Sequence, residues 1–507
     1  MFPSVSSNRL EGTTTQSSFV FGNANVTVFA IRFASDHTRI ALLMTLRFKK
    51  QWTLLGGPVF AAVVGFWLRT SGLEAPACWC AGVTVLCGIW WMFETIPLPA
   101  TGLVPFAVFP LAGILDHREI AHAYGHTLIL LMLAGSMLSA AMEKSGAHRR
   151  IALGMVRLIG TDARRLILGF LVTAAVLSMW VSNTATVLML LPVALAVLDQ
   201  APDRSRLAPP LLLAVAYGAA VGGSGTPIGT PPNLIMIENY REATGIEIGF
   251  PEWMRMGLPA TVLMLPVVWL WLSRGLAREK ERLAVPDPGE WQPDQKRVLF
   301  IFGLTAFAWM TRTAPFGGWS EWLELSEHAG DSTVALAAVV ALFSLPSGSG
   351  DGTRLLDWET ANRIPWGLFP IIGGGIALGM AFRETDLSGA TGRALLPLAS
   401  LPLPVMILCL CLFATFFTEF ATNTAVASIL MPVMAAVATS ADVNPMLVMI
   451  PVTLGLNWSF MLPAATVTNA MVYGTGEVTI QRMMREGCVL NLIGAVLVST
   501  VCYLTLR

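Results

Sequence analysis

Two short polar clusters interrupt long apolar stretches of the chain, and both contain the same types of residue. Ser178 and the triplet Ser182-Asn183-Thr184 form the first cluster, while Thr418 and the triplet Thr422-Asn423-Thr424 form the second. Their hydroxyl and amide oxygens carry no full charge and suit a dehydrated sodium ion, and the Asn and Thr side chains can also donate hydrogen bonds to a carboxylate. Because such groups are costly in apolar surroundings unless they have partners, both clusters are candidate binding sites.

The two clusters share a register with the residues around them. Asn183 and Asn423 are 240 residues apart, and the same offset carries Pro192 onto Pro432. A single Ser-Asn-Thr triplet in a membrane helix more often serves packing and inter-helix hydrogen bonding than ligand binding. Two copies in register reverse that judgement. We therefore infer that the chain consists of two related halves.

Each cluster is followed by an apolar run that cannot remain one helix. The run at 208–237 contains four glycines and three prolines between positions 222 and 233, and the run at 445–474 is interrupted at the equivalent place. A helix break exposes N–H groups that attract anions at one end and C=O groups that attract sodium at the other. Backbone carbonyls near Gly229 and Ala465 are therefore candidate cation ligands.

Neither the polar clusters nor the helix breaks contain Arg or Lys. A bound anion would have to be compensated by dipoles, hydroxyls and co-bound cations, so that cation and anion stabilise each other. Glu419, a carboxylate beside the second cluster, is either a functional group or a partnered structural acid, and the sequence leaves both interpretations open. A membrane enzyme would need a nucleophile with a base, or paired acids, and we expect none here.

The composition is that of a polytopic helical membrane protein. Of 507 residues, 54% are hydrophobic and 13% are charged, and the mean hydropathy is +0.65, far above that of soluble domains. The formal net charge of zero gives no support for a nucleic-acid partner. His117, His122 and His126 cluster in a polar connection, where we expect a solvated loop rather than a metal site.

We expect an all-α inverted-repeat membrane protein with about eleven transmembrane helices and two re-entrant helical hairpins. Non-helical backbone at membrane depth must be covered by protein or line a watery cavity, which favours hairpins at both polar clusters. Residues 1–50 are expected to be an N-terminal extension, disordered or not native, before a first transmembrane helix at 51–76. The first repeat is expected at 77–285, with a hairpin at 166–198 and a broken helix at 208–237, and the second at 286–507, with a hairpin at 403–437 and a broken helix at 445–474.

Basic residues predict the orientation of the chain. The link at 274–297 and the segment 149–165 are rich in Lys and Arg and should be cytoplasmic, whereas the acidic link at 321–327 should be outside. With eleven crossings the N-terminus lies in the cytoplasm, and the two hairpins open on opposite sides. This is the inverted-repeat plan of secondary transporters, in which ligands bind where the broken helices meet.

At these residues the chain resembles the divalent anion:sodium symporter family, which includes bacterial sodium-dicarboxylate symporters and animal di- and tricarboxylate and sulfate carriers. The resemblance runs from about residue 50 to the C-terminus. Its motifs are Trp90-Trp-Met-Phe-Glu94-Thr-Ile-Pro97-Leu-Pro99, Ser182-Asn183-Thr184, Gly225-Thr-Pro-Ile-Gly229-Thr230-Pro231-Pro232-Asn233, Gly373-Gly-Gly375 and Phe460-Met-Leu-Pro463-Ala-Ala465-Thr466.

The resemblance implies a homodimer in the lipid of the bacterial inner membrane, with an elevator-type movement of the transporting part. It implies a first sodium site formed by Ser178, Ser182, Asn183 and Gly229. It implies a second sodium site formed by Thr418, Ala421, Asn423 and Ala465. Substrate carboxylates would contact Asn183, Thr184, Asn423 and Thr424, and the site would be lined by Thr230, Thr466 and Val467.

One departure from the family pattern concerns the substrate. Where the second broken helix of the family usually has Thr-Pro-Pro-Asn, this chain has Thr466-Val467-Thr468-Asn469, which restores two backbone N–H groups. The resemblance implies sodium-coupled uptake of a C4-dicarboxylate such as succinate, malate or fumarate, without covalent chemistry. Sulfate or citrate as the substrate, or anion exchange instead of symport, are the alternatives that keep the same fold, and a passive anion channel is the alternative from another class.

Overall fold

The computed structural model describes residues 36–506 except 161, 277–284, 314–317, 349, 351 and 395–400. Within these residues the regular structure is helical, apart from one isolated bridge between Pro346 and Arg354. Eight of the described helices are long and apolar enough to cross a membrane. The expected all-α polytopic membrane protein is therefore confirmed, while the count of eleven crossings stays a prediction.

The described chain begins with a long helix, α2 (Asp36–Thr70), which is followed by α3 (Ala75–Phe93). Residues 1–35 of the expected N-terminal extension lie outside the described residues, whereas 36–50 belong to α2. The helix thus runs across the expected boundary at residue 50 and ends before the expected end at 76, because Gly72, with a φ of 96°, turns the chain there. Large apolar side chains of α2 are exposed, as expected for a helix that faces lipid.

The remaining helices of the first half comprise several short ones, the first hairpin and the first broken helix. The short helices are α4 (Leu98–Thr101), α5 (Val104–Leu111), α6 (His117–Tyr124) and α8 (Ala147–Ile159). The longer helix α7 (Thr127–Ser145) lies between α6 and α8. The hairpin consists of α9 (Ala163–Ser178) and α10 (Asn183–Leu198). The broken helix consists of α11 (Arg204–Gly222) and α12 (Pro231–Thr244). A membrane-spanning helix, α13 (Phe250–Ser273), follows.

The second half repeats this order. It begins with α14 (Pro293–Met310), α15 (Gly318–Trp322), α16 (Asp331–Ser344), α17 (Trp358–Ala361), α18 (Leu368–Glu384) and α19 (Leu387–Ala394). The second hairpin consists of α21 (Leu403–Phe417), the 3₁₀ turn η1 (Thr418–Phe420) and α22 (Asn423–Ser440). The second broken helix consists of α23 (Met446–Asn457) and α24 (Val467–Gly474). The last helix is α25 (Ile480–Leu506).

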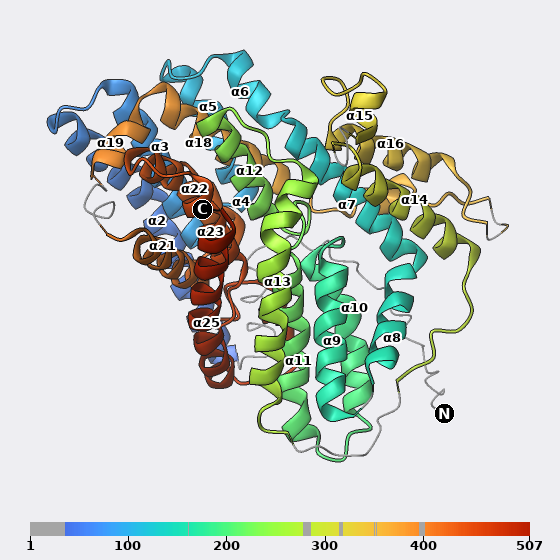
Figure 1. Cartoon of the computed structure of the whole chain (residues 1–507). Coiled ribbons are helices and arrows are strands. Elements are labelled where there is room, and N and C mark those ends of the chain that lie inside the picture. The colour runs from blue at the N-terminus through green and yellow to red at the C-terminus, as the bar shows by residue number, and fades with distance from the viewer. Residues whose placement is uncertain are drawn as a thin grey trace, which may run out of the picture.

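The two halves interlock through their hairpins and broken helices. The first helix of each hairpin packs against the first part of its own broken helix, α9 on α11 and α21 on α23. The second helix of each hairpin packs against the second part of the other broken helix, α10 on α24 and α22 on α12. In Figure 1, α9, α10, α11 and α13 stand side by side as one group of helices. Each half therefore completes the packing of the other.

Glycines allow the closest of these helix pairs to form. A Cβ atom added to Gly222 of α11 would lie 2.1 Å from the carbonyl oxygen of Ala175 in α9, and one added to Gly218 would lie 2.5 Å from that of Leu171. Such small residues let two membrane helices approach backbone to backbone, where dispersion forces are strongest. The α9–α11 contact thereby fixes the first hairpin on the first broken helix.

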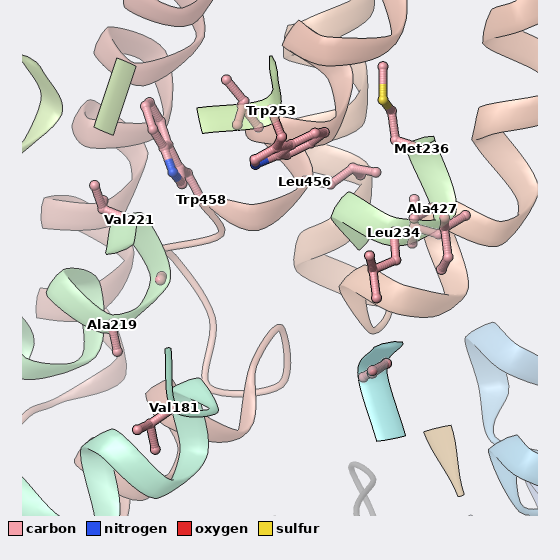
Figure 2. Close-up of a cluster of buried hydrophobic side chains, with 14 of the residues drawn as sticks. Val181, Ala219, Val221, Leu234, Met236, Trp253, Ala427, Leu456 and Trp458 are labelled. Atoms are coloured by element: carbon pink, nitrogen blue, oxygen red, sulfur yellow. The ribbon is translucent and has the colours of Figure 1, made fainter. Parts of the chain in front are cut away.

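A buried apolar cluster surrounds the place where the two broken helices meet (Figure 2). Val221 of α11, Leu234 of α12 and Leu456 of α23 are at most 1% exposed, and so are Trp253 and Trp458. Residues 223–227 of the first break and 458–460 of the second are buried, so the polar groups of these residues must find partners within the protein.

Candidate functional site

The first hairpin tip, residues 178–184, turns the chain between α9 and α10. Ser178 is fully buried, and its hydroxyl donates a hydrogen bond to Oδ1 of Asn183. The Ser182 side chain is exposed and caps α10 by accepting a hydrogen bond from the backbone N–H of Ala185 at 3.3 Å. Asn183 and Thr184 are half-buried in the first turn of α10. The tip therefore pairs a buried hydroxyl with a half-buried amide.

The second tip, residues 418–424, has the same central pair. Thr418 is fully buried and donates to Oδ1 of Asn423 at 2.8 Å. Ala421 is buried, and its backbone N–H donates to the carbonyl of Thr418. Thr422 precedes α22 but accepts no side-chain capping bond, unlike its counterpart in the first tip, and Thr424 is half-buried. The repeat seen in the sequence is thus a repeat of hydrogen bonding.

The breaks in the two helices form loops that are closed in the same way. The first loop is residues 223–230, and Asn233 just after it donates from Nδ2 to the carbonyls of Gly223 and Thr226, at 2.9 and 2.8 Å. The second loop is residues 458–466, and Asn469 makes the same two bonds 236 residues later, at 3.0 and 3.2 Å. Each asparagine therefore holds its loop in a compact turn.

The first loop contacts the first tip directly. The Thr226 hydroxyl donates to the carbonyl of Met179. A Cβ atom added to Gly223 would lie 2.7 Å from Asn183 Oδ1, and one added to Gly229 would lie 2.4 Å from the carbonyl oxygen of Gly223. Only glycine permits these approaches without displacement of the loop. The structure thus brings Asn183 against the loop that contains Gly229.

The second loop contacts the second tip through a hydroxyl that sequence reasoning missed. Ser459 is fully buried, and its Oγ donates to Asn423 Oδ1 at 3.2 Å. It occupies the position of Gly223 once the two loops are aligned at an offset of 236 residues, instead of the offset of 240 that relates the tips. A separate alignment of the loops could have revealed it. Ala465, at the position of Gly229, is also buried.

The helices that follow the loops begin in nearly identical conformations. Thr230 has φ and ψ of −152° and 144°, and Thr466 has −140° and 149°. The Thr466 hydroxyl accepts a hydrogen bond from the backbone N–H of Asn469 at 3.2 Å, whereas that of Thr230 makes no such bond. Val467, the first residue of α24, is half-buried. Val467-Thr468 in α24 therefore take the place of Pro231-Pro232 in α12 without a large change in the backbone conformation of the preceding residue.

We call the first tip with its loop the first half-site, and the second tip with its loop the second half-site. Four helices, α10, α12, α22 and α24, begin at these segments, so their N–H groups give a partial positive charge there. The helices that precede them present carbonyl groups with a partial negative charge. Arg, Lys and His are absent from 178–184, 223–230, 418–424 and 458–466, so the positive charge at these segments comes from helix N-termini.

Glu419 is a partnered structural acid. It is 1% exposed and accepts hydrogen bonds from the backbone N–H groups of Met461 and Leu462, each at 2.9 Å, and from Nδ2 of Asn491 at 2.7 Å. Three donors satisfy a buried carboxylate well, and they attach η1 to the second loop and to α25. Of the two interpretations left open by the sequence, the structure favours the structural one.

The expectation of a solvated loop around the histidines was wrong. His117 and His122 are exposed but lie in the helix α6, and the third histidine, His126, is buried. This residue is 6% exposed and precedes α7, where its ring lies 3.3 Å from a carboxylate oxygen of Glu238 and 3.0 Å from Nη2 of Arg241. The sequence could not show this burial because the partners come from α12. Among the described residues, no group of three or more His, Cys, Asp or Glu side chains could hold a metal ion.

Comparisons with known proteins agree with this architecture. A family profile described as "Citrate transporter" matches residues 89–453. The sodium-dependent dicarboxylate transporters SdcS of Staphylococcus saprophyticus and Staphylococcus aureus are each 32% identical to this chain over 472 residues, which cover 89% of this chain and 90% of each relative.

Two solved structures share the fold. The YdaH transporter of Alcanivorax borkumensis has a TM-score of 0.56 and 14% identity and covers 83% of this chain and 98% of its own. MtrF of Neisseria gonorrhoeae has a TM-score of 0.56 and 13% identity and covers 80% of this chain and 84% of its own. At this identity the similarity concerns the fold alone. From the profile match and the 32% identity to the SdcS transporters over 89% of its length, this chain belongs to the divalent anion:sodium symporter family.

Proposed function

We propose that this chain is a sodium-coupled symporter for C4-dicarboxylates such as succinate, malate and fumarate. The observation that carries the proposal is the pair of half-sites, each with a hydroxyl bonded to an asparagine, a loop closed by a second asparagine, and helix ends of both polarities. The relatives named sodium-dependent dicarboxylate transporters support both the ion and the class of substrate. Neither half-site contains a permanent positive charge, so the charge of a dicarboxylate would be balanced by sodium and by helix N-termini.

In this proposal sodium is bound by uncharged oxygens at the helix ends. The first sodium site comprises Ser178, Ser182, Asn183 and Gly229. The second comprises Thr418, Ala421, Asn423 and Ala465. The Oδ1 atoms of the two tip asparagines already accept hydroxyl hydrogen bonds, which fixes how their amide groups are rotated.

The substrate carboxylates would lie at the same tips. Oδ1 of each tip asparagine accepts from its buried hydroxyl, and the Nδ2 group would donate to a carboxylate oxygen. We propose that Asn183, Thr184, Asn423 and Thr424 bind the carboxylates, and that Thr230, Thr466 and Val467 line the site. Since the same asparagines contact both ion and substrate, binding of one favours binding of the other.

We further propose a homodimer in the bacterial inner membrane, with the N-terminus in the cytoplasm and an elevator-type movement of the site. The orientation is supported by contacts between the two basic segments. Arg157 donates to the carbonyl of Val285 and Arg164 to that of Leu276, each at 2.9 Å, so both segments lie at one end of the molecule. A concentration of positive charge at one end favours the cytoplasmic side.

Uptake of labelled succinate into proteoliposomes tests the proposal. Liposomes with an inward sodium gradient are compared with liposomes that have potassium on both sides, and unlabelled malate, fumarate, citrate and sulfate serve as competitors. Sodium-dependent accumulation that malate and fumarate inhibit supports the proposal. Uptake that requires only internal dicarboxylate would identify an exchanger instead.

Citrate is the second candidate substrate because the matching family profile is described as that of a citrate transporter. Citrate that inhibits uptake more strongly than malate, and is itself accumulated with sodium, would replace the C4-dicarboxylates in the proposal. Preferential accumulation of sulfate would make sulfate, rather than a C4-dicarboxylate, the proposed substrate.

A further inference from the structure

Three consecutive residues at the end of α23 contact both half-sites. Asn457 donates from Nδ2 to Ser224 Oγ at 3.2 Å and to Asn233 Oδ1 at 2.8 Å. Trp458 donates from Nε1 to the same Ser224 Oγ at 3.0 Å. Ser224 belongs to the first loop, and Asn233 is the residue that closes that loop. The second broken helix thus contacts the first half-site through two side chains.

The next residue, Ser459, belongs to the second half-site and connects its loop to its tip. The hydroxyl of Ser459 donates to Oδ1 of Asn423, and its carbonyl accepts from Nδ2 of Asn469, the residue that closes the second loop. Residues 457–459, which we call the bridge, therefore extend from the closing asparagine of one loop to the tip asparagine of the other half-site. Three consecutive residues thus connect Asn233 of the first half-site to Asn423 of the second.

The bridge lies in a part of the protein without access to water. Asn457, Trp458 and Ser459 are at most 2% exposed, and Ser224 and Asn233 are fully buried. Figure 2 shows Trp458 and Trp253 within the surrounding apolar cluster. A hydrogen bond lost here has no water to replace it, so movement of one partner forces movement of the other.

The bridge is present in one half only, which argues against a merely architectural role. At the offset that aligns the two loops, Asn457 corresponds to Val221 and Ser459 to Gly223. Neither Val nor Gly has a side-chain donor, yet the first half forms the same type of broken helix and the same closed loop. The repeat architecture therefore does not require the side-chain bonds of the bridge.

We propose that Asn457 and Ser459 are positioning residues that couple the two half-sites, so that occupation of one by sodium raises the sodium affinity of the other. The proposal rests on the proposed function for the identity of the ion. Closure of the first loop around a cation fixes Ser224 and Asn233, these fix Asn457, and the rigid bridge then holds Ser459 and Asn423 in the binding arrangement. Coupling of this kind is reciprocal.

The test replaces the bridge by residues that cannot make its bonds. In proteoliposomes, the initial rate of succinate uptake is measured against sodium concentration for the wild type, Asn457→Val, Ser459→Ala and the double variant. For Asn457→Val we expect a Hill coefficient that falls toward 1 and a half-saturating sodium concentration that rises about five- to tenfold, from the loss of buried hydrogen bonds. The Tyr217 hydroxyl of α11 still donates to the carbonyl of Phe460 in the second loop at 2.8 Å. We therefore expect α11 and the second loop to stay in contact and the maximal rate of Asn457→Val to change less than about twofold.

The double variant distinguishes a loss of coupling from separate effects of each substitution on its own half-site. If Asn457 and Ser459 act as one bridge, the Hill coefficient of the double variant equals that of Asn457→Val, because the connection is already interrupted. Thr453→Val is the matched control. It removes a buried hydroxyl that is hydrogen-bonded to the carbonyl of Met449 in the same helix and to Sδ of Met431 in α22. The bonds of both half-sites stay in place, and we expect wild-type cooperativity.

A wild-type Hill coefficient of 1, or unchanged cooperativity in Asn457→Val, overturns the proposal. If Asn457→Val does not yield folded protein, Ser224→Ala removes the acceptor that Asn457 and Trp458 share while the bond from Asn457 to Asn233 remains. This variant must then have a Hill coefficient below that of the wild type. Wild-type protein without any sodium-dependent uptake would disprove the proposed function. Sodium-driven uptake with unchanged cooperativity in the variants would overturn the coupling alone.

Discussion

The side chains of Asn183 and Asn423 have the most direct part in the proposed function, because each would contact both ion and substrate. We expect Asn183→Ala and Asn423→Ala to reduce sodium-dependent uptake to background. Asn183→Ala leaves the buried Ser178 hydroxyl without its acceptor, and Asn423→Ala does the same to the hydroxyls of Thr418 and Ser459. Each lost acceptor costs about 1–3 kcal/mol, which is below the typical stability of about 5–15 kcal/mol. Both variants should therefore remain folded by size-exclusion chromatography.

The control for these variants is Asn362→Ala. Asn362 is an exposed residue after α17, and its replacement should leave uptake unchanged. Wild-type uptake by either tip variant would contradict the assigned role.

Residue types alone were sufficient to predict the two tips but not their partners. The hydroxyl and Asn pattern repeats at a constant offset within the tips, so it could be recognised along the chain. Ser459 and Asn457 were missed because the loops follow a different offset, and because Ser459 corresponds to a glycine in the first half. The partners of Glu419 and His126 come from segments distant in sequence, which no local pattern indicates.

At the scale of helices, the start of α24 is the place where substrate preference can be tested. Thr466 has the extended backbone that a residue before proline requires, and Thr230 has the same conformation before Pro231. Proline is also tolerated in the first turn of a helix. We therefore expect the double substitution Val467→Pro and Thr468→Pro to preserve the fold.

The double substitution removes two backbone N–H groups from the first turn of α24, together with the Thr468 hydroxyl that is hydrogen-bonded to that of Thr466. We expect the ratio of inhibition by succinate to inhibition by sulfate or citrate to change by about tenfold, equivalent to loss of one hydrogen bond to a charged group. Competition assays in proteoliposomes measure this ratio. An unchanged ratio would show that these N–H groups do not contact the substrate.

The contact between α9 and α11 predicts a different kind of sensitivity. Gly222→Ala would place a methyl group 2.1 Å from the Ala175 carbonyl oxygen, so the helices must separate. We expect a loss of about 2–4 kcal/mol, seen as a lower Tm and poor recovery of monodisperse protein. Gly154→Ala in α8 is the matched control, since no atom lies within 4 Å of the added Cβ. Equal Tm values for the two variants would contradict this packing argument.

Helix positions were predictable where the sequence contains strong interruptions. The cluster of Gly and Pro at 222–233 predicted the first broken helix, and the repeat of the pattern predicted the second. The two polar tips, repeated in register, predicted the two hairpins. The extent of α2 was not predictable, since its first residues precede the apolar run. The short helices α4, α5 and α8 were also not foreseen, because packing rather than local pattern decides where they end.

Considered as a whole, the molecule should be stabilised by the ion that it binds. A ligand at ten times its Kd adds about 1.4 kcal/mol per site to the stability of the folded state. We expect the Tm of purified protein to rise by a few degrees when potassium chloride is replaced by sodium chloride at equal ionic strength.

The same comparison with the combined Asn183→Ala and Asn423→Ala variant provides the control, and its Tm should not respond to the exchange of cations. A wild-type Tm that is equal in sodium and potassium would contradict the assignment of sodium to these sites.

The interlocking of the two halves has a consequence for the synthesis of the protein. Helix α10 packs against α24, which is translated about 270 residues later. At a translation rate of about 5–20 residues per second, the first tip waits roughly 15 to 50 seconds in the membrane before its final neighbour emerges. During that interval its polar groups need another cover, from the insertion machinery or from lipid headgroups. We therefore expect the nascent first half to be more sensitive to quality-control proteases than the complete chain.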